Sequence, residues 1–266
     1  LKEKIQLAYY KPLFRSSECL VYVCEGQKRY WVQRGLRGRR TEVIYNGVDL
    51  EHWRPVAEEE RATRRFRLGL PSDAFVVGMS AVLRPEKNHV QLVEAIARLR
   101  QRGIGAHALL DGDGETRGAI EARARALGVG RAVTITGLQK DVRPLVGGCD
   151  AVALCSTAVE TFSLAALEAM ALARPVVHSE IGGAKEMIQP GHDGYLFPVN
   201  DTGTLVERLA ALAEPALRGV LGENARRTVE ERFSERSMIE RYESILIELA
   251  ATRSKRDDVR RRATAH

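Results

Sequence analysis

Short apolar runs alternate with segments of helical periodicity from residue 75 onward. The runs are almost continuously apolar, which is typical of strands covered on both faces of a sheet. They lie at residues 75–80, 107–110, 132–136, 151–155, 175–178 and 195–197. Helices are predicted between or after them at residues 88–102, 115–127, 141–147, 164–173, 184–188, 201–213 and 215–231. This alternation predicts an α/β fold with a doubly wound, Rossmann-like parallel sheet, in which ligands bind at the carboxyl ends of the strands.

The two ends of the chain depart from this pattern. Residues 1–52 hold only two strand candidates, at 20–24 and 42–45, around a helix at 25–34. A segment with this small number of elements cannot bury a core. We therefore interpret residues 1–52 as the end of an N-terminal domain and a linker, and we expect the rest of that domain to be missing here. Residues 53–233 form the predicted Rossmann-like domain. Residues 234–250 form an amphipathic C-terminal helix, and the polar segment 251–266 is predicted to be a disordered basic tail.

Composition and charge exclude several classes of protein. Hydrophobic residues make up 44% of the chain and charged residues 29%, a globular balance without an apolar run long enough to span a bilayer. The net charge of +6 arises at the ends: residues 1–40 hold ten Lys and Arg against three Glu, and 251–266 hold six against two Asp. No aromatic side chains are interleaved with the basic ones, so nucleic-acid binding is not expected. Solvated ends are the main interpretation, and peripheral contact with an anionic membrane is the alternative.

The four cysteines, at positions 19, 24, 149 and 155, form no CxxC pair and have no histidine at metal-ligand spacing. We therefore expect reduced, buried thiols that hold no metal. Reduced thiols favour a cytoplasmic protein, with the inner face of the membrane as the alternative location.

The strongest chemical signal is the segment from Glu160 to Glu168, where a predicted strand gives way to a helix. Backbone N–H groups of Ser163 and Leu164 would lie at the start of this helix, whose partial positive charge favours phosphate. Glu160 precedes the helix, and Glu168 lies within it among apolar residues. A carboxylate on a largely buried helix needs a partner, which favours a ligand over a solvated surface.

Further candidates follow the other strands. Arg84 and Lys87 come directly after the first strand, where a cation could neutralise a diphosphate, although a solvated basic loop is the alternative. The turn 111–114 after the second strand would let backbone approach a ligand. Gly137 and Leu138 follow the third strand and could present backbone to a nucleotide base. Gly182-Gly183 is interpreted as a turn before a helix, and His178 as structural.

Taken in order, the segments Asn46-Gly-Val-Asp49, Leu83-Arg-Pro-Glu-Lys87, Gly112-Asp-Gly114, Glu160-x7-Glu168 and Arg174-Pro-Val-Val177 resemble glycosyltransferase family 4. The resemblance implies the C-terminal, donor-binding domain of a GT-B enzyme. Such an enzyme transfers a sugar from a UDP- or GDP-linked donor to a saccharide or lipid-linked acceptor, with retention of configuration and without a metal or other cofactor. The resemblance implies that Glu160 meets the donor sugar, Glu168 the ribose and Lys87 the diphosphate. It also implies that the backbone of Phe162, Ser163 and Leu164 lines the sugar and the diphosphate. It also places the 234–250 helix back across the N-terminal domain.

This chain departs from the family pattern at several positions. Val82 stands where the family usually has Arg, so Arg84 is the candidate to supply that cation, and Thr161 and Ser163 replace usual glycines. Two rival functions therefore stay open. One is a non-catalytic module that binds nucleotide sugars, and the other is a sugar-nucleotide epimerase of GT-B type.

Overall fold

The computed structural model describes the backbone of residues 2–263 and the side chains of residues 7–252. It divides the chain into two compact units: unit 1 comprises Leu1–Gly47 with Phe233–His266, and unit 2 comprises Val48–Arg232. The sequence suggested divisions after residues 52 and 233. The structure instead groups the C-terminal helix with the N-terminal segment and assigns 48–52 to unit 2.

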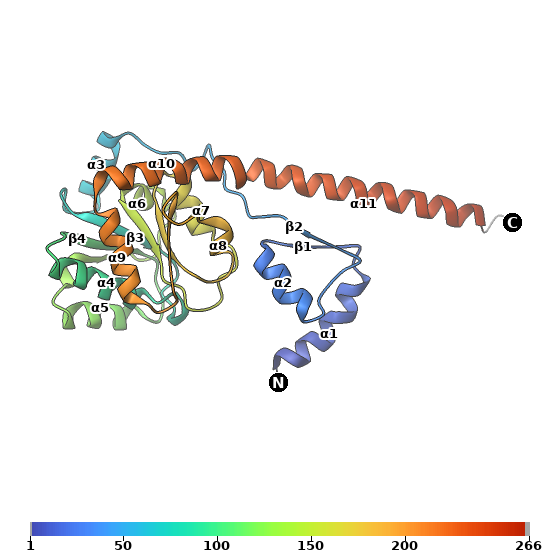
Figure 1. The fold of residues 1–266 in the computed structure, drawn as a ribbon, viewed down its shortest axis with the longest axis horizontal. Coiled ribbons are helices and arrows are strands. Elements are labelled where there is room, and N and C mark those ends of the chain that lie inside the picture. Colours follow the sequence, from blue (N-terminus) through green and yellow to red (C-terminus); the bar gives the residue numbers. More distant parts are fainter. Residues whose placement is uncertain (1, 264–266) are drawn as a thin grey trace. The chain divides into compact units, whose positions relative to one another are not determined.

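Among the described residues, unit 2 is built on a parallel sheet with the strand order β5-β4-β3-β6-β7-β8 (Figure 1). The strands are β3 (Phe75–Ser80), β4 (Ala106–Asp111), β5 (Val133–Ile135), β6 (Ala151–Leu154), β7 (Val176–Ser179) and β8 (Gly194–Phe197). Each overlaps a strand expected from the apolar runs. The predicted doubly wound parallel sheet is therefore confirmed.

Helices cover both faces of this sheet (Figure 1). They are α3 (Glu58–Arg67), α4 (His89–Gln101), α5 (Arg117–Ala126), α6 (Arg143–Gly148), α7 (Leu164–Ala171), α8 (Ala184–Met187), α9 (Thr202–Leu212) and α10 (Pro215–Arg232), with short 3-10 turns at Pro85–Lys87 and Gly130–Ala132. One face packs against α4, α5 and α9 through alternate strand residues such as Val77 and Ala153. On the other face, Val76 and Leu109 belong to a smaller cluster with Leu145 of α6.

Helix α3 was not predicted from the sequence, because its residues are almost all charged. Its first turn is acidic, at Glu58, Glu59 and Glu60, and its last turn is basic, at Arg64, Arg65 and Arg67. This order of charges complements the helix dipole and is the signal that would have revealed the helix. Its packing face is polar as well, since Arg61 and Arg65 are the residues it buries.

Asp150, at the start of β6, is the partner of these buried arginines. Its carboxylate pairs with Arg61 and Arg65, lies 3.3 Å from Arg218 Nη2, and accepts a hydrogen bond of 2.7 Å from Val76 N. Its side chain is 3% exposed. One buried carboxylate thus joins α3 and α10 to the amino-terminal edge of the sheet, because a buried charge needs several partners to offset its lost hydration.

We predict that Asp150→Asn lowers the free energy of unfolding by about 3–5 kcal/mol, since it leaves buried guanidinium groups without a counter-charge. Thermal or urea unfolding measures this loss. Asp141→Asn is the matched control, because the Asp141–Arg143 pair has side chains that are 46% and 35% exposed and should contribute about 1 kcal/mol or less. Similar losses in the two variants would contradict the role given to Asp150.

Unit 1 combines both ends of the chain. It holds α1 (Lys2–Ser16), β1 (Cys19–Tyr22), α2 (Glu25–Gln33), β2 (Arg40–Val43) and α11 (Glu235–Ala263), and its two strands pair in parallel. Helix α11 contacts the N-terminal segment through two ion pairs, from Arg40 to Glu248 at 2.6 Å and from Arg241 to Glu42 at 3.2 Å. Gly47 N also donates to Met238 Sδ at 3.2 Å.

The prediction of a disordered tail at 251–266 is wrong for residues 251–263, because α11 continues to Ala263. No glycine or proline interrupts the segment, so polar composition alone does not end the helix. Residues 264–266 lie outside the described residues. Within the described part of the chain, no helix combines the length and apolar character that crossing a membrane requires.

Candidate functional site

The order of the strands reverses between β3 and β6. From β3 the chain moves outward through β4 to β5, and it then returns to β6 and moves outward through β7 to β8. The connections that leave β3 and β6 therefore diverge at the carboxyl ends of these two central strands, which is where ligands bind in sheets of this kind. Residues 81–88 follow β3, and residues 155–163 follow β6.

Two predicted site residues meet across this reversal point. Lys87 Nζ lies 2.7 Å from Glu160 Oε2, and the two side chains are 27% and 12% exposed. The backbones of the same two loops are also joined, because Thr157 N donates to the carbonyl of Glu86 at 2.8 Å. The structure thus brings together a cation and a carboxylate that are 73 residues apart in sequence.

A second layer of hydroxyl groups supports Glu160. Ser156 Oγ donates to Glu160 Oε2 at 3.0 Å, and Ser179 Oγ donates to the carbonyl of Ser156 at 2.7 Å. Both serines are buried. Sequence reasoning missed them, although each lies at or just beyond the carboxyl end of a strand, where small polar residues often contribute to a site.

His178 lies on β7 beside this layer. Its Nδ1 is 2.7 Å from the Ser179 carbonyl, which can only accept, so this nitrogen carries the proton. Burial lowers the pKa of the imidazole, and the nearby Glu160 and Lys87 act on that pKa in opposite directions. His178 is therefore a buried ring close to the Lys87–Glu160 pair, and its structural role stays a prediction.

Helix α7 begins directly after Glu160. Ser163 is its N-cap residue and accepts a hydrogen bond of 3.4 Å from Ala166 N through its side chain. The first backbone N–H groups of α7 have no carbonyl partner within the helix, so the predicted helix start is present, and phosphate binding there stays a prediction. Phe162 is buried, whereas Leu164 is half exposed.

Glu168 lies about one turn into α7. Burial raises the pKa of its carboxyl to about 7. No hydrogen bond or ion pair to a described side chain offsets that burial. A half-buried carboxylate without a partner in the protein is the arrangement expected where a ligand supplies the hydrogen bonds.

The structure does not bring Arg84 to the ion pair. Its side chain is 62% exposed, and its Nη1 lies 4.0 Å from Glu86 Oε1. Among the described residues, no hydrogen bond joins the Arg84 side chain to Lys87 or Glu160, although Lys87 N donates to the Arg84 carbonyl at 3.1 Å. Val82 and Arg84 are exposed on this loop, whereas the Lys87 side chain pairs with Glu160 of the β6 loop.

The glycines after β4 approach backbone rather than open space. A Cβ on Gly112 would lie 2.2 Å from the carbonyl oxygen of Ala81, and one on Gly114 would lie 2.5 Å from that of Leu83. These residues therefore support the loop that carries Lys87. Gly137 holds the same turn through a hydrogen bond from Gly112 N at 3.1 Å, and Leu138 beside it is exposed.

Gly182 supports the Glu160 loop in the same way. A Cβ there would lie 2.2 Å from the carbonyl oxygen of Glu160 and 2.7 Å from that of Thr161. The loop itself contains Val159 at φ 56, a conformation that β-branched residues rarely adopt. The turn interpretation of Gly182-Gly183 therefore holds, and the structure adds a close contact with the strained loop.

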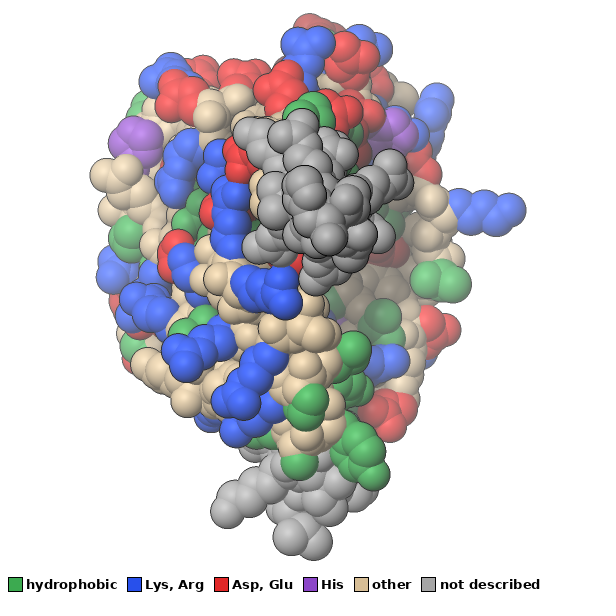
Figure 2. All heavy atoms as spheres, turned by 90° about the vertical axis from the view of Figure 1, so that its right-hand side faces the viewer, with side chains coloured by type: hydrophobic (Ala, Val, Ile, Leu, Met, Phe, Trp, Pro, Cys, Tyr) green, Lys and Arg blue, Asp and Glu red, His purple; other side chains and the backbone are tan. Residues whose placement is uncertain are grey.

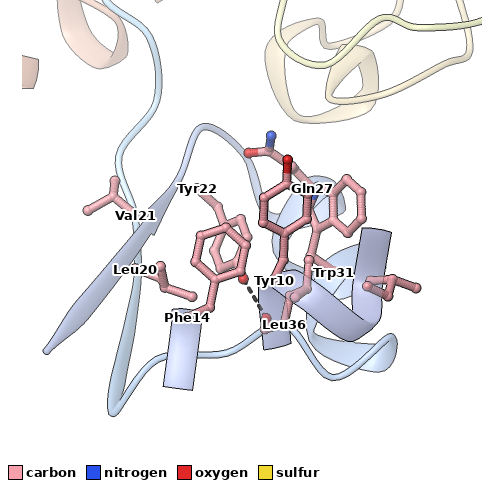
Figure 3. A pocket seen from close by; sticks show the side chains of 9 residues that line it. Tyr10, Phe14, Leu20, Val21, Tyr22, Gln27, Trp31 and Leu36 are labelled. Atoms are coloured by element: carbon pink, nitrogen blue, oxygen red, sulfur yellow. Dashed lines mark hydrogen bonds between the residues drawn. The ribbon is translucent and has the colours of Figure 1, made fainter. Parts of the chain in front are cut away.

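A separate hollow of about 340 Å³ lies in unit 1. Figure 3 shows Tyr10 and Phe14 of α1, Tyr22 of β1 and Trp31 of α2 around it, with the Tyr22 hydroxyl donating to the carbonyl of Leu36 at 2.6 Å. Its lining is mainly apolar and shares no residue with the Lys87–Glu160 site. Unit 1 by itself thus leaves aromatic side chains around an open space.

The charged surface is mixed on the face drawn in Figure 2, where many Lys and Arg side chains lie among Asp and Glu. The cysteines are free, with Cys24, Cys149 and Cys155 buried and Cys19 half-buried. Burial raises the pKa of Cys149 and Cys155 to about 12, so both stay as thiols. Among the described residues, no three His, Cys, Asp or Glu side chains gather as metal ligands would.

Comparison with known families decides the class of protein. The model of the family "Glycosyl transferases group 1" matches residues 60–228, which is more than half of the chain. The chain belongs to this family. The match includes β3 to β8, Lys87, Glu160 and Glu168, and so covers the site described above.

Individual relatives agree with the family. The putative glycosyltransferase EpsD of Bacillus subtilis is 30% identical over 246 residues, which cover 90% of this chain and 64% of EpsD. An Escherichia coli relative, UDP-Gal:alpha-D-GlcNAc-diphosphoundecaprenol alpha-1,3-galactosyltransferase, is 23% identical over 80% of this chain and 56% of its own length. The chain therefore spans somewhat more than half of these relatives.

Solved structures show the same fold. Anabaena Alr3699/HepE, crystallised in complex with UDP and glucose, superposes with a TM-score of 0.84 at 26% identity, over 91% of this chain and 67% of HepE. HepE has also been crystallised in complex with UDP-glucose. This member of the glycosyltransferase family therefore shares the fold of HepE.

We predict that Gly182→Ala destabilises the protein more than Gly191→Ala. Both glycines have positive φ, at 59° and 79°, so both variants incur a left-handed backbone cost of about 1–2 kcal/mol. A Cβ on Gly191 meets nothing within 4 Å, whereas one on Gly182 collides with the Glu160 loop. Thermal unfolding of the two variants measures the difference, and equal melting temperatures would refute the contact.

Proposed function

We propose that this chain holds the donor-binding part of a retaining GT-B glycosyltransferase of family 4 type, which uses a UDP- or GDP-linked sugar. The observation that carries the proposal is the Lys87–Glu160 pair beside the start of α7, at the point where the strand order reverses. The family match and the HepE complexes with UDP and UDP-glucose support a nucleotide-sugar ligand.

The groups at the site suit the parts of such a donor. The start of α7 offers N–H groups and partial positive charge to the diphosphate, and Lys87 adds a full charge. Because Arg84 is exposed and turned toward Glu86, we assign the cationic role to Lys87 alone. Glu160 accepts from sugar hydroxyls, Glu168 accepts from the ribose, and backbone at Gly137 and Leu138 borders the base.

In the proposed reaction, the bond between the sugar C1 and the diphosphate oxygen breaks, and its electron pair leaves with the nucleoside diphosphate. A bond forms between C1 and an acceptor oxygen, whose proton passes to the departing diphosphate oxygen. Lys87 stabilises the negative charge that develops on the leaving diphosphate. We propose a saccharide or lipid-linked saccharide as acceptor and a role in polysaccharide synthesis, and the name of the Escherichia coli relative contains such an acceptor.

We predict that the two carboxylates divide the donor between them. Glu160→Ala should weaken binding of UDP-glucose about tenfold or more and leave UDP affinity nearly unchanged, because UDP lacks the sugar. Glu168→Ala should weaken both ligands by similar factors, since both contain the ribose. Isothermal titration calorimetry with the two ligands measures this, and equal losses for both ligands in Glu160→Ala would contradict the division.

We predict that the two loop cations differ in effect. Lys87→Ala should lower UDP affinity about tenfold or more, because it removes a partly buried charge next to the diphosphate. Arg84→Ala should change the affinity by less than about threefold, since an exposed cation is screened by water and salt. Titrations of both variants at the same ionic strength measure the effects, and a larger loss in Arg84→Ala would reverse the assignment.

We predict that donor affinity depends on pH through Glu168. Burial raises the pKa of this carboxyl to about 7, so the acceptor form of the group is depleted below that pH. UDP-glucose affinity should therefore increase as the pH rises from 6 to 8, and the increase should be absent in Glu168→Gln. UDP-glucose is the suitable probe because it has no terminal phosphate that titrates near pH 6. A flat profile in the unmodified protein would exclude this linkage.

A further inference from the structure

The Glu160 carboxylate has two unlike oxygens in this structure. Oε2 receives both Lys87 Nζ, at 2.7 Å, and Ser156 Oγ, at 3.0 Å. Among the described residues, no hydrogen bond reaches Oε1. Because the protein holds Oε2 from two directions, the rotation of the carboxylate is defined and Oε1 is left for a ligand.

The backbone that carries Ser156 is clamped from both sides. The pairing of β6 with β7 ends at Leu154 and His178, so the β6–β7 ladder does not extend to Ser156. The Ser179 hydroxyl supplies the missing link, since it donates to the Ser156 carbonyl at 2.7 Å. On the other side, Thr157 N donates to the Glu86 carbonyl at 2.8 Å.

The turn at Val159 then reverses the chain, so that Glu160 returns to Ser156 four residues earlier. Ser179 is fully buried, and its hydroxyl donates to the Ser156 carbonyl and not to Glu160. Among the described hydrogen bonds, the path from the Ser179 hydroxyl to Glu160 therefore runs through Ser156. A hydroxyl that merely satisfied a buried carbonyl would contribute to stability without affecting which ligand the site prefers.

We propose that Ser179 is a positioning residue for donor-sugar recognition: through Ser156 it orients Glu160 so that Oε1 faces the sugar of a nucleoside diphosphate sugar. This inference rests on the proposed function and deepens it, because it names the oxygen atom that binds the sugar and a buried residue that positions this atom. Small displacements of a recognition group have large effects on binding, since hydrogen-bond energy falls steeply with misalignment.

A double-mutant cycle on the full chain tests the proposal. The variants are Ser179→Ala, Glu160→Gln and the double variant, and calorimetry measures their affinities for UDP-glucose and for UDP. We expect Ser179→Ala to weaken UDP-glucose about tenfold and UDP less than twofold. In the Glu160→Gln background, Ser179→Ala should cause no further loss, because two residues that act through one contact are not additive.

Two further variants separate positioning from stability. Ser179→Thr retains the hydroxyl and should restore UDP-glucose affinity. Thr228→Val removes another buried hydroxyl, which donates to Asp193 at 2.8 Å, and should lower the melting temperature without altering the ratio of the two affinities. If Ser179→Ala does not fold, Ser156→Ala is the alternative, because it removes the next hydrogen bond in the series, from Ser156 Oγ to Glu160. It should give the same loss of affinity for UDP-glucose.

The outcomes distinguish the inference from the function on which it rests. If the unmodified chain binds neither UDP-glucose nor GDP-glucose, the proposed function fails and the inference with it. If the unmodified chain binds but Ser179→Ala weakens UDP and UDP-glucose equally, the inference alone is overturned. If Ser179→Ala weakens UDP-glucose binding as much in the Glu160→Gln background as in the unmodified chain, the inference is overturned as well.

Discussion

The reversal of strand order between β3 and β6 is the constraint on which the site depends. Parallel pairing brings all carboxyl ends to one edge of the sheet, and the reversal separates the two connections that leave the central strands. Lys87 comes from one connection and Glu160 from the other. The glycines at 112, 114 and 182 serve the same arrangement, because each allows backbone to approach one of these two loops closely.

The two ends of strand β6 carry carboxylates with different roles, one in stability and one in the proposed function. At its amino end, Asp150 is buried, and its carboxylate is paired with arginines and accepts a backbone N–H within the protein. At its carboxyl end, Glu160 keeps one oxygen without a partner among the described residues, and Glu168 in the following helix has a raised pKa. A buried charge with several partners in the protein stabilises the fold, whereas a buried carboxylate oxygen without a protein partner indicates a ligand.

The polar interior also explains where sequence patterns were insufficient. Apolar runs located every strand of unit 2, because burial on both faces leaves a strong local signal. Helix α3 escaped prediction, since it is held through Arg61 and Arg65 and not through an apolar stripe. The extension of α11 to Ala263 was missed for a related reason, because polar composition resembles disorder even where no residue breaks a helix.

The sequence by itself determined the class of fold, the positions of the strands and the chemical character of the site, because hydrophobic periods and short motifs are local properties of the chain. Only the tertiary structure decided that Lys87 and not Arg84 meets Glu160, and that the Ser156 hydroxyl bonds to Glu160 while the Ser179 hydroxyl bonds to Ser156. These contacts join residues that lie on different strands and loops. Sheet order and loop geometry bring them together, and neither can be derived from the spacing of residues along the chain.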